Sequence, residues 1–221
     1  MEKTKVLLID MYGVIIKESK GYFIPYTFQR FEEAEHERLT KAFKEERCFS
    51  KAQKGELTNE AFLKYLGYQN PDKTMEDYLK NYLTLDEQFH EFARANSKRI
   101  DFCLLSNDVS EWSEFLTEYH GMNQYFKEKI VSGAVHLRKP DKKIFECALG
   151  RLQRNAEDCV FVDNSVKNLR VAEELGIKTI LFNRDGEEYD GNVVNDFMEL
   201  NEVIKSFHIE KKHIADTIET Y

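Results

Sequence analysis

Short apolar runs separated by longer amphipathic stretches form the main pattern of this chain. Five runs have the length of buried strands: residues 6–9, 102–105, 130–131, 160–162 and 179–182. Runs that are apolar on both faces are typical of a parallel sheet covered by helices on each side. The pattern therefore predicts an α/β fold, and we interpret residues 193–194 as a last edge strand.

The segments between these runs have helical periodicity. The stretch WSEFLTEYHG (112–121) places Trp112, Phe115, Leu116 and Tyr119 at helical spacing, with Gly121 as a stop signal. Residues 142–152 show a similar apolar face, and a helix over 168–175 is expected to stop at Gly176. The tail is interpreted as two helical stretches, NEVIKSF (201–207) and IADTIETY (214–221).

Residues 17–97 differ from the rest because they contain no convincing strand. The pattern predicts a helix over 28–43, a second after Thr58 as N-cap, and a third starting at Thr74 with Asp77 in a capping box. We therefore expect a core domain of residues 1–16 and 98–221. An all-helical cap subdomain of residues 17–97 is inserted in it.

Charge and composition restrict the classes of partner. The 221 residues are 42% hydrophobic and 33% charged, as in globular proteins, with a formal net charge of −8. Such a surface repels nucleic acid and anionic membranes but still allows a local pocket for a small anionic substrate. No apolar run approaches membrane-spanning length, and the N-terminus leaves no room for a signal peptide. We expect a soluble, cytoplasmic protein; its oligomeric state is left open.

The four cysteines show no metal-binding spacing. None of them forms a CxxC pair, and Cys103 and Cys159 lie in apolar stretches. Buried structural thiols are the simplest interpretation, and they indicate a reducing compartment.

Polar residues follow four of the apolar runs. They are Asp10, then Ser106 and Asn107, then Arg138, Lys139 and Pro140, then Asp163, Asn164 and Ser165. Each one alone fits a turn, a helix cap or a solvent-exposed lysine. Ligands of parallel sheets bind beyond the carboxyl ends of the strands, so their joint occurrence there indicates a site.

This set of residue types suits the chemistry of a phosphate or a similar anion. The two carboxylates are ligands that Mg²⁺ prefers, and Lys139 would neutralise an anionic substrate. Ser106 and Asn107 have groups that donate to phosphate oxygens, and Asp10 is placed to attack phosphorus or carbon.

The stretches LLIDMYGVI, LLSND, RKPDKKIF and VFVDNSVKN resemble, in order and spacing, the four motifs of the haloacid dehalogenase superfamily. The resemblance implies a three-layer sandwich with a Rossmann-like parallel sheet and the helical cap of the first cap class. It also implies hydrolysis, in most members phosphatase chemistry through an aspartyl-phosphate with Mg²⁺.

The resemblance assigns roles position by position. Asp10 matches the nucleophile and a metal ligand, the backbone carbonyl of Tyr12 a second ligand, and Asp163 a third. Ser106 and Lys139 match the groups that hold the transferred phosphoryl group. Asn107 follows the second-motif serine and is expected to orient the substrate.

Tyr12 departs from the common DxDG pattern, because the second aspartate normally acts as general acid and base. Three hypotheses follow. The first is a Mg²⁺-dependent phosphatase of a small phosphorylated metabolite that releases a good leaving group. The second is a metal-free 2-haloacid dehalogenase, which resembles this chain in DxYG but differs at Val14, Phe145 and Asp163. The third is a catalytically impaired phosphate-binding or regulatory member, to which Tyr12 and Asn164 point.

We favour the phosphatase because Asp10, Lys139 and Asp163 are intact. The cap is expected to set the substrate, and its early aromatic residues either line an entrance or pack the cap. Phe23 and Tyr26 lie close after the first motif and are the positions to test.

Overall fold

A sheet of six parallel strands lies at the centre of the computed structural model, which describes residues 5–19 and 22–206. The strand order is β3-β2-β1-β4-β5-β6. The bounds are β1 Lys5–Ile9, β2 Ile100–Ser106, β3 Phe126–Val131, β4 Cys159–Asp163, β5 Lys178–Phe182 and β6 Asn192–Val194. All five predicted runs lie in strands, and residues 193–194 form the edge strand β6, so the α/β prediction is confirmed.

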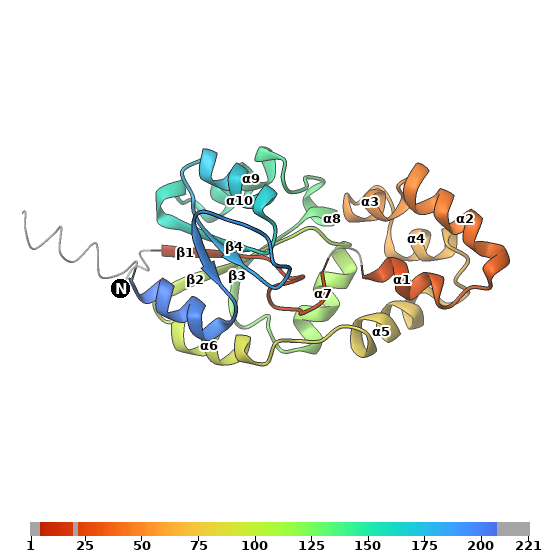
Figure 1. Ribbon diagram of the computed structural model, residues 1–221, viewed down its shortest axis with the longest axis horizontal. Coiled ribbons are helices and arrows are strands. Elements are labelled where there is room, and N and C mark those ends of the chain that lie inside the picture. The colour runs from red at the N-terminus through yellow and green to blue at the C-terminus, as the bar shows by residue number, and fades with distance from the viewer. Residues whose placement is uncertain (1–4, 20–21, 207–221) are drawn as a thin grey trace, which may run out of the picture.

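Alternating side chains of the central strands enter two separate cores. In β1, Val6 and Leu8 pack under α9 (Lys142–Leu152) and α10 (Val166–Glu174). Leu7 and Ile9 face α6 (Gln88–Asn96), α7 (Ser110–Tyr119) and a helix over 197–206. Figure 1 shows α9 and α10 on one side of the sheet and α6 on the other. This is the predicted three-layer sandwich.

Most predicted elements of the core are found. Helices α7, α9 and α10 cover the expected segments, and Gly121 and Gly176 follow α7 and α10 with φ of 63° and 85°. Residues 201–206 are helical as expected, within the longer helix over 197–206. The predicted helix IADTIETY lies outside the described residues.

The insertion between β1 and β2 is helical (Figure 1). It contains α1 (Phe23–Phe28), α2 (His36–Thr40), α3 (Cys48–Gln53), α4 (Asn59–Tyr65) and α5 (Pro71–Asn81), with short 3₁₀ and π turns at Glu33–Glu35 and Lys41–Glu45. The rings of Phe89 and Phe92 in α6, which follows, pack against Phe197 of the core. The exact cap boundaries stay a prediction.

Two helix predictions in the cap are wrong. The single helix over 28–43 is broken, because α1 ends at Phe28 and α2 starts only at His36. The third helix begins at Pro71 rather than Thr74, because Pro71 suits the first helical turn and the Asn70 side chain accepts the N–H of Lys73 (3.3 Å). The Thr58 cap of α4 is confirmed: its hydroxyl accepts the N–H of Ala61 (3.2 Å).

The two linkers between core and cap pair with each other. Ile16 and Leu85 form an antiparallel bridge, and the Lys17 N–H donates to the Thr84 carbonyl (2.9 Å). We call residues 15–18 and 84–86 the paired linkers. The chain thus enters and leaves the insertion at one place.

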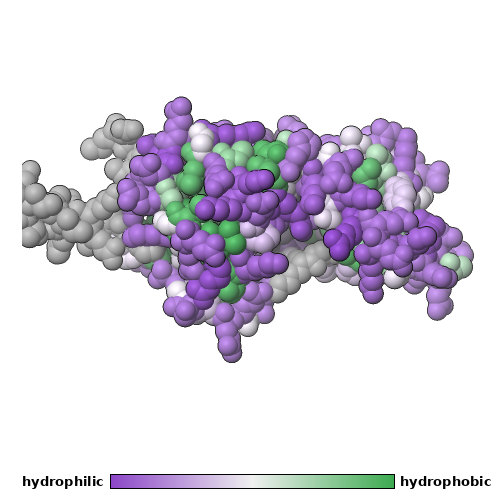
Figure 2. Space-filling view, turned by 90° about the horizontal axis from the view of Figure 1, so that it is seen from above, coloured by the Kyte–Doolittle hydropathy of each residue, from purple (hydrophilic) through white to green (hydrophobic). Residues whose placement is uncertain are grey.

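The face that carries α9 and α10 is mostly hydrophilic over the cap and is hydrophilic with apolar patches over the core (Figure 2). All four cysteines are free, and Cys48, Cys103 and Cys159 are buried, as expected of structural thiols. Within residues 5–19 and 22–206, no helix has the length and apolarity needed to cross a membrane.

Candidate active site

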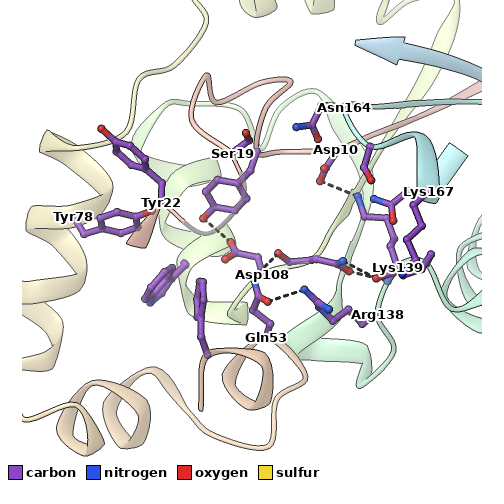
Figure 3. A pocket seen from close by; sticks show the side chains of 17 residues that line it. Asp10, Ser19, Tyr22, Gln53, Tyr78, Asp108, Arg138, Lys139, Asn164 and Lys167 are labelled. Carbon is purple, nitrogen blue, oxygen red and sulfur yellow. Dashed lines mark hydrogen bonds and ion pairs between the residues drawn. The ribbon is translucent and has the colours of Figure 1, made fainter. Parts of the chain in front are cut away.

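A cavity of about 340 Å³ lies where the carboxyl ends of β1, β2 and β4 meet the cap (Figure 3). Four predicted site residues line it: Asp10, Tyr12, Asn107 and Lys139. Ser106 and Asp163 are fully buried and do not line it. The remaining wall residues are Ser19, Tyr22, Phe49, Gln53, Tyr78, Asp108, Trp112, Arg138, Pro140, Asn164, Ser165, Lys167 and Asn168.

Lys139 is the centre of a buried ion cluster. Its Nζ lies 2.9 Å from Asp10 Oδ1 and 2.7 Å from Asp163 Oδ2, and it donates to the Leu105 carbonyl (2.7 Å). An ammonium has three N–H donors, so these contacts use all of them. Only 1% of Lys139 is exposed, which excludes the simple interpretation of a solvent-facing lysine beside Pro140.

The ion cluster shifts the pKa values of its members. Burial raises the pKa of Asp10 to about 7, and Asp163 adds to this rise while Lys139 opposes it. Burial works against the charged form of Lys139, but the two carboxylates outweigh it and raise the pKa of the lysine. Lys139 is therefore protonated, and Asp10 ionises close to neutral pH.

The carboxylate of Asp163 is occupied by protein donors. Oδ1 accepts the N–H of Ser165 (2.8 Å), Oδ2 accepts Lys139, and the Asn168 amide lies 3.1 Å from both oxygens. The neighbouring Asn164 lines the cavity instead, close to Asp10 (Figure 3). At the end of β4, the Asp163 carboxylate thus points to Lys139, and Asn164, the next residue, lines the cavity.

Asn164 packs against the first-motif loop at Gly13. A Cβ atom on Gly13, whose φ is 80°, would lie 2.2 Å from Asn164 Nδ2, so only glycine fits there. The same Nδ2 donates to Asp185 Oδ2 (2.7 Å).

Asn107 and Ser106 differ in how their side chains are used. The Asn107 amide donates to the Lys139 carbonyl (2.9 Å) and accepts the Lys139 N–H (2.8 Å). This reciprocal pair fixes the backbone beside the ion cluster. The buried Ser106 hydroxyl has no hydrogen-bond partner among the described residues, which is unusual for a buried polar group. Their predicted contacts to a substrate stay predictions.

The Tyr12 hydroxyl is bound to a second buried carboxylate. It donates to Asp108 Oδ2 (3.1 Å), which also accepts the Ser113 hydroxyl (2.6 Å). Burial raises the pKa of Asp108 to about 7 and raises that of Tyr12 well above its usual value. Tyr12 is thus a hydrogen-bond donor rather than a base. Asp108 was not among the predicted site residues, although it ends the quoted stretch LLSND.

The cap contributes aromatic rings to the cavity. Tyr22, Phe49 and Tyr78 line it, together with Trp112 of α7. Phe23 and Tyr26, the two positions selected from the sequence, are buried and do not line it. The Phe23 ring lies 5.0 Å from that of Tyr78 and 4.9 Å from that of Trp112. Helical spacing gave no signal that separates the lining rings from the packed ones.

The donor set fits a divalent cation only in part. Within the part of the chain that the structure describes, no three His, Cys, Asp or Glu side chains are grouped to hold a metal ion. The cavity is lined by two carboxylates, those of Asp10 and Asp108, and by the Asn164 amide, while Asp163 contacts Lys139 and does not line it. Amide and carbonyl oxygens also suit Mg²⁺, but they supply less charge than a carboxylate.

The fold and the cavity define a class: a parallel α/β core with an aspartate and a lysine at the strand ends, covered by a helical cap. A model of the haloacid dehalogenase-like hydrolases matches residues 4–176. The chain belongs to this family.

Similar solved structures include an enzyme bound to magnesium and inorganic phosphate and a haloacid dehalogenase. This chain resembles a HAD family enzyme from Bacteroides thetaiotaomicron in complex with magnesium and inorganic phosphate. The match covers 84% of this chain and 97% of that enzyme (TM-score 0.69, 21% identity). The chain also resembles the L-2-haloacid dehalogenase RSc1362 over 92% of this chain and all of the other (TM-score 0.67, 17% identity). At these identities, the likeness shows the fold alone.

A glyceraldehyde 3-phosphate phosphatase of Methanocaldococcus jannaschii is 27% identical over 105 residues, which cover 44% of this chain and 45% of that protein. The matches to curated relatives span less than half of those proteins' own length.

Proposed function

We propose that the chain is a Mg²⁺-dependent phosphatase of a small phosphorylated metabolite, with Asp10 as nucleophile. The observation that carries the proposal is the placement of the Asp10 carboxylate at the cavity wall, held by a protonated lysine. Two further cations, Arg138 and Lys167, line the same cavity, which favours an anionic substrate. The phosphatase and Mg²⁺-bound proteins among its similar structures and relatives support the same chemistry.

The side chains present can carry out the covalent step. Asp10 Oδ1 accepts the Met11 N–H (2.8 Å) and contacts Lys139, which orients the carboxylate and leaves Oδ2 for attack on phosphorus. Attack forms an aspartyl-phosphate and breaks the bond from phosphorus to the leaving oxygen. Water then hydrolyses the acyl phosphate and restores Asp10.

The site lacks a carboxylic acid at position 12 that could protonate the leaving group. The Tyr12 hydroxyl stands where the family usually has an acid, and it already donates to Asp108. Substrates whose leaving group needs little protonation, such as anomeric or acyl phosphates, are therefore favoured.

Mg²⁺ would be held by the Asp10 carboxylate, the Tyr12 backbone carbonyl and, in place of the predicted Asp163, the amide oxygen of Asn164, which is a residue of the cavity wall. When bound, it supplies positive charge that stabilises the transferred phosphoryl group. Lys139 supplies a fixed positive charge from the protein itself.

A second candidate, the metal-free dehalogenase, is favoured by one observation: both oxygens of Asp163 are already occupied by protein donors. A parallel screen of phosphate release and halide release, with Mg²⁺ and with EDTA, separates the two. We expect phosphate release that EDTA abolishes and Mg²⁺ restores. Halide release that is insensitive to EDTA would overturn the proposal, and release of neither product would favour a binding or regulatory member.

A further inference from the structure

Arg138 lies in the cavity wall, one residue before Lys139, and its charge is not compensated. The only hydrogen bond from its side chain to a described residue runs from Nη2 to the neutral amide oxygen of Gln53 (3.2 Å). The Nε of Arg138 is buried and has no hydrogen-bond partner among the described residues. Burial lowers the pKa of this guanidinium below its usual value, and no neighbouring carboxylate offsets the effect.

The positive charge of Lys139, in contrast, is already compensated by carboxylates. Lys139 contacts two carboxylates, so the cluster of Lys139, Asp10 and Asp163 has a net charge of −1 when both acids are ionised. Leaving a partly buried arginine without an acidic partner costs free energy that a bound anion recovers. Guanidinium groups bind carboxylates and phosphates through two parallel hydrogen bonds.

We propose that Arg138 binds a second anionic group of the same substrate, so that the substrate is a phosphate ester that also carries a carboxylate or a second phosphate. This inference rests on the proposed function, because it places the transferred phosphoryl group at Asp10. A cavity of about 340 Å³ is within the range that holds a small metabolite with both groups.

The partner of Arg138 comes from the cap. Gln53 ends α3, and its Nε2 donates to the Asn107 carbonyl (3.2 Å) in the core. Gln53 therefore spans the seam between cap and core and holds the guanidinium through a neutral group (Figure 3). A carboxylate at this position would neutralise Arg138 without a ligand.

The first experiment measures kcat/KM for pairs of phosphate esters that differ in the second anion. One pair is glucuronic acid 1-phosphate and glucose 1-phosphate, and the other is glucose 1,6-bisphosphate and glucose 1-phosphate, so that every substrate carries the anomeric phosphate that this site favours. In one pair, we expect kcat/KM to be higher by roughly tenfold or more for the ester that carries the second anionic group, because hydrogen bonds between charged groups are the strong ones. The two pairs distinguish a carboxylate from a phosphate.

Variants of the arginine and its partner test the assignment. Arg138→Gln is expected to reduce the preference for the ester with the second anionic group, measured as the ratio of kcat/KM values within a pair, by roughly ten- to a hundredfold. Gln53→Glu should reduce it as well, whereas Gln53→Leu, which removes the hydrogen bonds without adding charge, should reduce it less. Arg151→Gln removes an exposed arginine of α9 that pairs with Glu128 and should leave the preference unchanged.

Calorimetric binding of phosphonoacetate and ethylphosphonate, in the presence of Mg²⁺, gives a readout without turnover. Tighter binding of phosphonoacetate that is lost in Arg138→Gln supports a carboxylate subsite. Equal kcat/KM for the two members of both pairs would overturn the inference, and so would an equal loss of kcat/KM for both members in Arg138→Gln. In either case, phosphate release would still support the proposed function. Absence of phosphate release and of phosphonate binding overturns both.

Discussion

The two walls of the cavity are built from different materials. The core wall carries ions and amides whose donors are largely satisfied, with Lys139 bound to two carboxylates and Asn107 paired to its backbone. The cap wall carries rings such as Phe49 and Tyr78, which both pack against the ring of Phe23. The difference indicates that the core fixes the reacting groups, while the cap shapes the space for the rest of the substrate.

The largest effect is expected at Asp10, because the covalent step depends on it alone. Asp10→Asn keeps the size and the polar contacts of the side chain but removes the nucleophile, and should lower kcat by at least about 10⁴-fold. Phosphate release measures the loss, and circular dichroism checks the fold. Substantial activity in the folded variant would remove the nucleophile assignment.

Lys139→Met tests whether the core wall is held together by its ion cluster. The change leaves Asp10 and Asp163 buried without their counter-charge, and should destabilise the protein by about 3–5 kcal/mol at pH 8. Urea denaturation measures it. Adding Asp163→Asn to the variant should recover part of the loss, and no recovery would indicate that the carboxylates are not coupled through the lysine.

Asp108→Asn tests the second buried acid. The pKa of Asp108 is about 7 in the folded protein and about 3.9 when unfolded, so the folded state holds its proton more tightly. This contribution to stability is present below about pH 4 and is lost as the pH rises to about 7.

The Asp108→Asn variant should therefore lose less stability than the wild type between pH 4 and 8, by up to roughly 4 kcal/mol. Asp10 contributes a slope of the same sign in both proteins, so the difference between them reports Asp108 together with its interaction with Asp10. Urea denaturation at several pH values measures it, and parallel curves would contradict the shifted pKa.

Phe49→Ala tests the cap wall and has the smallest expected effect. The Phe49 ring stacks on Phe62 with a centroid distance of 5.5 Å, so its loss should destabilise the protein by about 2–3 kcal/mol. We expect KM to rise several-fold with little change in kcat, because the ring does not contact Asp10 or Lys139. Phe23→Ala, at a packed position that does not line the cavity, is the matched control for stability.

The core was predictable from the sequence in more detail than the cap, whose helical character was predicted but whose helix bounds and cavity-lining rings were not. A buried parallel strand needs an apolar run, and its carboxyl end is fixed by the sheet, so Asp10, Asn107 and Lys139 could be placed at one edge from the sequence. Asp163 and Asn164 are adjacent, and only the twist of the chain after β4 decides which side chain faces the cavity.

In the cap, short helices pack against each other through rings at similar spacing. Whether Phe23 or Phe49 reaches the cavity depends on how α1 and α3 are oriented, and helical periodicity does not carry this information. Gln53 is a polar residue at a helix end, which in sequence looks like any solvated position. Its contacts with Arg138 and Asn107 exist only because the cap rests on the core.

The paired linkers have a consequence for how the chain can change in length. Strands β1 and β2 are adjacent, with Lys5 opposite Ile100, although the whole cap lies between them in sequence. The entropy cost of closing such a loop grows only with the logarithm of its length, by about 0.6 kcal/mol per doubling. Because both ends of the cap meet at Ile16 and Leu85, residues can be gained or lost within it without moving the strands. The cap can therefore change in length or sequence while the strand ends that carry the reacting groups of the core stay in place.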